Sequence, residues 1–340
     1  MKLTKFISVA TLATLTAGAM AANSPKPDMK TVLDEMKKDT SKPVEQGDAT
    51  EARLKTSPQS LAEKMATKKG TLEKVANVEI SDIEVMGAEG KIPARVYKPT
   101  GAGPLPVVLY FHGGGWVIGK NEDYDATLKT LASKSGAIYI SPEYRKGPEN
   151  KFPAAHDDAF AAYLWVIKNA STIGGDSMKI AVAGESAGGN LAMNIAIRAR
   201  DMKMQMPIHQ LIVYPVAGTD MKTASYQANK DAKPLNSAMM GWFMKNYLRN
   251  TEDLKDKRIN LVEADLKGLP PTTIITAGID PLNSEGKKLA DKLESQGVNV
   301  TYKDYPGMTH EFFSMAPVLN DAKQAQEEAS KEMKDSFKKF

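Results

Sequence analysis

The sequence predicts an α/β fold with a mostly parallel central sheet and helices on both of its faces. Short, continuous apolar runs recur from residues 107–111 to residues 272–276, and such runs are typical of strands buried on both faces. Segments with helical periodicity alternate with these runs, as they do in parallel sheets. Hydrophobic residues make up 42% and charged residues 25% of the 340 residues, which is an ordinary globular composition.

The strands and helices are expected in a definite order. Residues 78–85 and 92–97 alternate in polarity around a turn at 87–90, which predicts an antiparallel pair. Buried strands are expected at residues 107–111, 137–140, 179–183, 210–214 and 272–276, with a last strand at 298–302. The helices between and after them are expected at residues 154–168, 188–200, 285–295 and 321–340.

Two further stretches are expected to form a helical cap. In the N-terminal extension, residues 22–73, Met29, Val32 and Met36 are spaced along one helical face, and a second helix is expected after a cap at Ser60. Residues 218–266 interrupt the alternation with Met-rich and aromatic helical segments. A lid over a binding site would lie there, above the carboxyl edge of the sheet. The main domain, residues 74–340, carries this insertion.

Residues 1–21 have the three parts of a secretory signal peptide. Lys2 and Lys5 give a positive start, residues 6–20 are apolar, and Ala19-Met20-Ala21 is a small-residue cleavage pattern. The apolar run is shorter than the roughly 20 residues of a membrane-spanning helix. We therefore expect bacterial export to the periplasm or the medium, with cleavage near Ala21 and no membrane attachment afterwards.

The composition excludes several classes of function. The formal net charge is +4, from 45 basic and 41 acidic residues, which is too small an excess to favour a nucleic-acid partner. The chain has no cysteine, so disulfides, thiolate metal sites and a cysteine nucleophile are ruled out. With neither an HExxH motif nor clustered histidines, no metal and no cofactor is expected. The oligomeric state is left open.

The strongest chemical motif is Gly184-Glu185-Ser186-Ala187-Gly188, between a predicted strand and a predicted helix. In this context G-x-S-x-G forms a sharp turn that exposes the serine hydroxyl. The glycines let strand and helix approach each other closely. The start of the helix brings backbone N–H groups and the positive end of its dipole near the serine oxygen. The motif predicts Ser186 as a nucleophile.

A second motif, His112-Gly113-Gly114-Gly115, follows the strand at residues 107–111. Adjacent glycines leave amides unshielded, and such amides can bind a developing oxyanion. The alternatives are a flexible turn and a phosphate-binding loop, but the glycine and lysine spacing of phosphate loops is absent. Upstream of a G-x-S-x-G elbow, a triple glycine supplies oxyanion donors in lipases and esterases.

Two histidines follow Ser186 in the sequence. His209 lies at the start of a predicted strand, on the edge away from the elbow, and is expected to be an ordinary surface residue. His310 lies in a glycine-containing loop after the last predicted strand, where a base can reach the serine. His310 is therefore the candidate base.

The acid that orients this base should lie between serine and histidine in the chain. Asp280 is the first carboxylate after the strand at residues 272–276, and Glu285 and Asp304 are its rivals. The strand-end position favours Asp280, because an acid there can orient the imidazole.

Together the HGGG, GESAGG, Asp-Pro-Leu and Gly-x-x-His motifs resemble the hormone-sensitive-lipase-like esterases, the bacterial type IV carboxylesterases of the α/β-hydrolase fold. The resemblance extends from about Val78 to about Phe313 and includes residues 141–145 and 152–159. It implies Ser186 as the nucleophile, with Asp280 and His310 as its partners. It also implies an oxyanion hole drawn from Gly113, Gly114, Gly115 and Ala187, with Gly114 and Gly115 as the preferred pair of the loop.

The resemblance implies hydrolysis of short-chain acyl esters through an acyl-enzyme. Four residues near the motifs are candidates for the substrate pocket: Trp116, Glu185, Trp242 and Phe243. The aromatic ones could instead only pack the cap onto the main domain. Two alternatives stay open: an amidase, peptidase or deacetylase on the same scaffold, and a non-catalytic relative that binds a ligand.

Overall fold

The computed structural model describes residues 24–340, so the expected signal peptide lies outside the described residues. Eight strands form one sheet in the order β1-β2-β4-β3-β5-β6-β7-β8. The pairs β1·β2 and β2·β4 are antiparallel and all others are parallel. The bounds are β1 Val78–Gly87, β2 Gly90–Pro99, β3 Leu105–Phe111, β4 Ile138–Pro142, β5 Gly175–Glu185, β6 Gln210–Val213, β7 Thr272–Ile279 and β8 Val300–Thr309.

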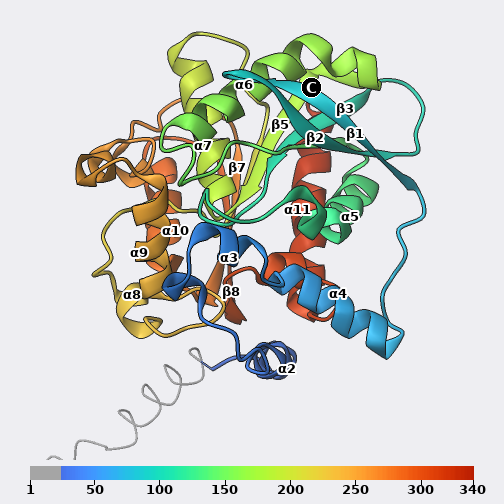
Figure 1. Ribbon diagram of the computed structural model, residues 1–340. Helices are drawn as coiled ribbons and strands as arrows, with labels where there is room; N and C mark the ends of the chain where they lie inside the picture. Colours follow the sequence, from blue (N-terminus) through green and yellow to red (C-terminus); the bar gives the residue numbers. More distant parts are fainter. Residues whose placement is uncertain (1–23) are drawn as a thin grey trace, which may run out of the picture.

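Helices cover both faces of the sheet (Figure 1). One face packs against α6 (Ala154–Asn169), α7 (Ala187–Asp201) and α10 (Asn283–Ser295), and the other against α5 (Asp125–Ser135) and α11 (Asn320–Lys338). The last five residues of β3 and the last six of β5 are buried, which explains their continuous apolar runs. The predicted α/β fold with a mostly parallel sheet is confirmed.

Two elements differ from the sequence prediction. α5 was not expected, although Leu128, Leu131 and Ala132 are spaced along one buried helical face and Gly136 ends the helix in a left-handed conformation. β8 was expected to end at residue 302, but it continues to Thr309 through an alternation of exposed and buried positions. The segment before His310 is therefore strand, where we expected loop.

The extension and the insertion lie at one end of the molecule (Figure 1). The extension contributes α2 (Pro27–Met36), α3 (Ala49–Arg53) and α4 (Pro58–Lys69), and the insertion contributes α8 (Ala224–Ala228) and α9 (Ser237–Tyr247). Trp242 joins the two parts, because its Nε1 donates to the Gly47 carbonyl at 2.9 Å. The N-cap of α4 is Ser57 where we expected Ser60, since Pro58 starts the helix and the Ser57 hydroxyl accepts from the Ser60 amide. No helix among residues 24–340 is long and apolar enough to cross a membrane.

His209 is buried, which corrects the expectation of a surface residue. Only 3% of it is exposed, beneath the C-terminal helix α11. Its Nε2 lies 3.0 Å from Thr273 Oγ1 and its Nδ1 lies 2.8 Å from Ser336 Oγ. The sequence did not reveal this burial, because α11 reaches back across the face of the sheet from far along the chain.

Candidate active site

Ser186 occupies the turn between β5 and α7. Its φ of 55° and ψ of −118° are costly for a residue other than glycine. The Ser186 N–H donates to the Val213 carbonyl at 2.9 Å, and the Ser186 carbonyl accepts from Val216 at 3.1 Å. A Cβ on Gly188 would lie 2.0 Å from the Phe111 carbonyl oxygen, so only glycine lets α7 start this close to the end of β3. The Ser186 side chain does not cap α7, which leaves its hydroxyl unused by the helix.

The glycine loop lies against this turn. A Cβ on Gly113 would be 3.5 Å from the Ser186 Cβ. The Gly113 N–H donates to the Tyr124 hydroxyl at 3.1 Å, so this amide is already in use. This contact corrects the expectation that Gly113 is an oxyanion donor, and Gly114 and Gly115 stay the candidate donors of the loop.

Ala187 and Gly115 complete the surroundings of the serine. Ala187 is the first residue of α7, and the first N–H groups of a helix have no acceptor within it. Gly115 has φ 59°, and a Cβ on it would lie 2.2 Å from the Phe243 ring. The α9 side chain of Phe243 therefore packs directly onto the glycine loop.

Strand pairing brings the acid and the base together. Ile279 of β7 pairs with Thr309 of β8, beyond an irregularity in the register. Asp280 and His310 are the next residues along the two strands, so they emerge side by side. His310 Nδ1 donates to Asp280 Oδ2 at 2.6 Å, and Asp280 Oδ1 accepts from the Leu282 N–H at 2.9 Å.

The Asp280 carboxylate changes the proton affinity of His310. Burial disfavours the imidazolium, but the charge and hydrogen bond of Asp280, together with the charges of Glu311 and Glu185, raise the pKa of His310 above its ordinary value. The imidazole lies 4.5 Å from the Tyr214 ring between centroids, and the preceding residue, Val213, accepts from the Ser186 amide. Serine and histidine thus both lie at the end of β6. No hydrogen bond joins their side chains within the described residues, and such bonds often tighten only when substrate binds.

The rival acids are engaged elsewhere. Glu285 Oε1 accepts from the N–H groups of Ala217 and Gly218, at 2.8 and 3.1 Å, where the insertion begins. Asp304 accepts from Thr276 at 2.7 Å and from Asn283 at 2.8 Å. Of the three candidate acids, Asp280 is therefore the one that is hydrogen-bonded to His310, as its position at the end of a strand predicted.

Glu185 is turned into the core, which corrects its expected place in the substrate pocket. It is 1% exposed, and its carboxylate accepts from Tyr110, from Tyr214 at 2.5 Å and from Ser314 at 2.6 Å. Burial raises the pKa of Glu185, and the hydroxyl groups oppose that effect. Ser314 lies four residues after His310 in the chain. The hydrogen bond between Ser314 and Glu185 therefore connects the turn at Ser186 to the segment that carries His310.

The aromatic candidates have different surroundings. Trp116 is fully buried and stacks on Tyr247 of α9, with ring centroids 4.8 Å apart. Trp242 packs against the extension through its bond to Gly47. The Phe243 ring packs against Gly115 of the glycine loop.

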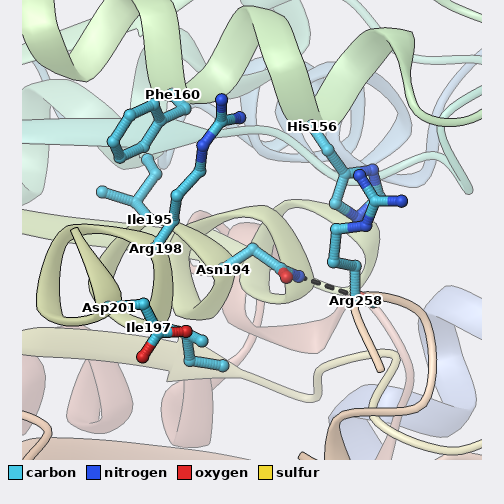
Figure 2. A pocket seen from close by; sticks show the side chains of 8 residues that line it. All are labelled: His156, Phe160, Asn194, Ile195, Ile197, Arg198, Asp201 and Arg258. Atoms are coloured by element: carbon cyan, nitrogen blue, oxygen red, sulfur yellow. Dashed lines mark hydrogen bonds between the residues drawn. The ribbon is translucent and has the colours of Figure 1, made fainter. Parts of the chain in front are cut away.

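A hollow of about 190 Å³ lies away from these residues, on α6 and α7 (Figure 2). None of the predicted site residues lines it. His156, one of its lining residues, has both ring nitrogens engaged, with Tyr247 at 2.8 Å and Asn190 at 2.9 Å. Its two arginines, Arg198 and Arg258, pair with aspartates. The hollow therefore offers neither an unpaired charge nor an available imidazole.

Three groups beside the site were not singled out from the sequence. They are Tyr124, which holds the Gly113 amide, Tyr214, which packs on His310, and Glu311, which follows His310. Tyr214 ends a predicted strand and Glu311 adjoins the predicted base, so their positions offered a signal. Tyr124 offered none, because it reaches the loop through tertiary packing.

Comparisons with known proteins show which family the chain resembles. A family model described as the alpha/beta hydrolase fold matches residues 108–314. The chain is 38% identical over 239 residues to the carboxylesterase NlhH of Mycobacterium tuberculosis, covering 69% of this chain and 75% of the relative. It is 32% identical over 249 residues to an ethyl acetate hydrolase of Pseudomonas putida, covering 72% and 78%.

A solved structure extends the similarity beyond the family match. The hyperthermophilic esterase from the archaeon Pyrobaculum calidifontis superposes with a TM-score of 0.84 at 35% identity, covering 92% of this chain and 98% of that one. The resemblance that the motifs indicated is therefore confirmed.

Proposed function

The chain belongs to the α/β-hydrolase fold family and is a carboxylic ester hydrolase, and we propose that it cleaves short-chain acyl esters through Ser186, His310 and Asp280. The observation that carries this proposal is the 2.6 Å hydrogen bond between His310 and Asp280, next to a serine in a strained turn. An imidazole held at Nδ1 by a carboxylate presents Nε2 as the proton acceptor.

The first half of the reaction acylates the serine. His310 Nε2 accepts the Ser186 proton while Oγ bonds to the ester carbonyl carbon. The N–H groups of Gly114, Gly115 and Ala187 hold the oxyanion that forms. The imidazolium, stabilised by Asp280, then gives its proton to the alcohol oxygen as the carbon–oxygen bond breaks.

The second half returns the enzyme to its starting state. Water loses a proton to His310 as its oxygen attacks the acyl carbon. The tetrahedral intermediate collapses to the free acid, and the proton on His310 passes back to Ser186 Oγ.

Short acyl groups are favoured by the position of Phe243. Its ring lies against Gly115, beside the proposed place of the scissile carbonyl, and limits the room there. One relative is named an ethyl acetate hydrolase, an enzyme for a two-carbon acyl group. In an acyl series from acetyl to decanoyl, we expect the highest kcat/KM at the short end, and we expect Phe243→Ala to move the optimum to longer chains. An unchanged optimum in the variant would remove Phe243 from the pocket.

The mechanism is tested by assaying the purified protein on p-nitrophenyl esters and on the matching amides. Ser186→Ala should lose hydrolysis and labelling by an organophosphate, whereas Ser133→Ala, the same change at a half-buried α5 residue that bonds Asn77, should keep both. Equal rates of hydrolysis of ester and amide would indicate that the protein is an amidase. Labelling without turnover would favour a ligand-binding relative.

We further propose that the protein is exported after removal of residues 1–21. The support is the sequence alone: two lysines, an apolar run and a small-residue cleavage pattern. N-terminal sequencing of the protein from the periplasm and the medium of a bacterial host tests this. A retained Met1 would contradict it.

A further inference from the structure

Glu311 directly follows the proposed base and has no role in the mechanism above. Its backbone lies in the left-handed region, with φ 66° and ψ 3°, which is uncommon for a residue other than glycine. Strained residues at functional sites are a reason to look for a role. The turn brings the Glu311 carboxylate to Gln59, whose Nε2 donates to Oε2 at 2.9 Å.

Gln59 belongs to the N-terminal extension and is 2% exposed, in the first turn of α4. The same turn binds Asp123, which accepts from the hydroxyls of Ser57 at 3.0 Å and Ser60 at 3.1 Å. Asp123 precedes Tyr124, the residue that holds the glycine loop. The start of α4 is thus linked to the segments on both sides of the site.

Several ionisable groups face Glu311 from the elements around it. They are His310 on its own turn, Asp123 and Tyr124 from the 3₁₀ helix at Asn121–Tyr124, Glu185 from β5 and Tyr214 after β6. The helix α11 presents the uncharged Gln326 to the neighbouring Phe313 carbonyl. Of the ionisable groups, His310 alone can carry a positive charge.

The charge of Glu311 changes in the neutral range. Burial raises its pKa to about 7, the carboxylates of Glu185 and Asp123 add to this effect, and the charge of His310 opposes it. In turn, Glu311 is one of the groups that raise the pKa of His310. The two groups therefore titrate as a coupled pair.

We propose that Glu311 is a positioning residue for the base: its carboxylate, held by Gln59, stabilises the imidazolium that forms when Ser186 loses its proton. This inference rests on the proposed function, because it needs His310 as the base. The amide of Gln59 suits both states of the group, since its N–H donates to a carboxylate and its carbonyl accepts from a carboxylic acid. The extension thereby holds Glu311 in place throughout its titration.

The first test is the pH profile of Glu311→Gln, an almost isosteric change that removes the negative charge. Loss of that charge lowers the pKa of His310, and kcat/KM requires a neutral imidazole. The acid limb of kcat/KM should therefore move to lower pH by about 0.5–1 pH unit. At high pH, kcat should fall about 3- to 10-fold, because the imidazolium is less stabilised in the transition state.

The second test is Gln59→Ala, which takes away the donor that holds the ionised carboxylate. The pKa of Glu311 should rise further, so this variant should behave like Glu311→Gln at neutral pH. At high pH, where Glu311 ionises even without Gln59, its kcat should return toward that of the wild type. A merely structural role would lower kcat equally at every pH.

Glu328→Gln is the matched control, because Glu328 lies on α11 and accepts from the Tyr305 hydroxyl at 2.8 Å, away from His310. Its profile should equal that of the wild type. An unmoved acid limb in Glu311→Gln, or a pH-independent loss in Gln59→Ala, overturns the inference. If Glu311→Gln does not fold, as judged by thermal unfolding, the Gln59→Ala profile decides alone. A wild type without esterase activity would instead overturn the proposed function.

Discussion

His310 and His209 lie at opposite ends of the parallel strands and are equally buried, each 3% exposed. His310 follows the end of β8 and donates a hydrogen bond to Asp280. His209 precedes the start of β6, and its two ring nitrogens lie within hydrogen-bond distance of the hydroxyl groups of Thr273 and Ser336. The pKa of His310 is raised, whereas burial, with a smaller effect of Lys339, lowers that of His209 to about 4.

The difference shows that burial alone does not make a histidine a base. A buried imidazole without a charged partner is neutral at physiological pH and serves packing. A buried imidazole beside a carboxylate can accept a proton during the reaction, because the charge that develops has a partner. Three predictions test this contrast.

The largest difference in kcat is expected between the two alanine variants of these histidines. His310→Ala should lower kcat about 10⁴- to 10⁶-fold, because the serine loses its base. His209→Ala should leave kcat within about 2-fold and lower the free energy of unfolding by about 1–3 kcal/mol, because Thr273 and Ser336 lose a buried partner. Ester hydrolysis and denaturant unfolding measure the two effects. A large loss of kcat in folded His209→Ala would contradict the contrast.

Asp280→Asn should give the next largest effect. The amide carries no charge to stabilise the imidazolium, and its NH₂ can donate to Nδ1 and so favour the wrong tautomer of His310. The value of kcat should therefore fall about 10⁴-fold while the protein still folds. Asp304→Asn is the matched control, since Asp304 contacts Thr276 and Asn283 and does not contact His310. Equal losses of kcat in the two variants would mean that activity depends on negative charge at this edge of the sheet and not on the hydrogen bond between Asp280 and His310.

The smallest effect is on stability in acid. The folded pKa of His209 is about 4, below the unfolded value of about 6.5, so the unfolded state binds a proton in this interval and the folded state does not. Stability is thus full above about pH 6.5 and falls toward pH 4, by at most about 3 kcal/mol for this residue. His156 has the same lowered pKa of about 4 through burial.

In the His209→Gln variant, the free energy of unfolding should therefore fall less steeply between about pH 6.5 and pH 4 than in the wild type. His156 should account for a similar share of the fall in the wild type. Denaturant midpoints of wild type and variant across the interval measure it. A decline of unchanged steepness in the variant would mean that other groups cause the acid sensitivity.

The sequence by itself determined the α/β fold and the positions of the buried strands along the chain, because each apolar run and each helical period is a local property. It also determined the elbow at Ser186, since the glycines and the serine lie within a few residues of one another. The pairing of His310 with Asp280 could be expected, because both residues follow predicted strands of one sheet.

Only the tertiary structure decided which groups are already engaged. The Gly113 amide is held by Tyr124, Glu185 is turned to a cluster of hydroxyls, and His209 is covered by α11. Each of these contacts joins segments that lie apart in the chain, so no local pattern encodes them. The link from Gln59 to Glu311 spans most of the sequence, and it arises because α4 packs beside the histidine turn.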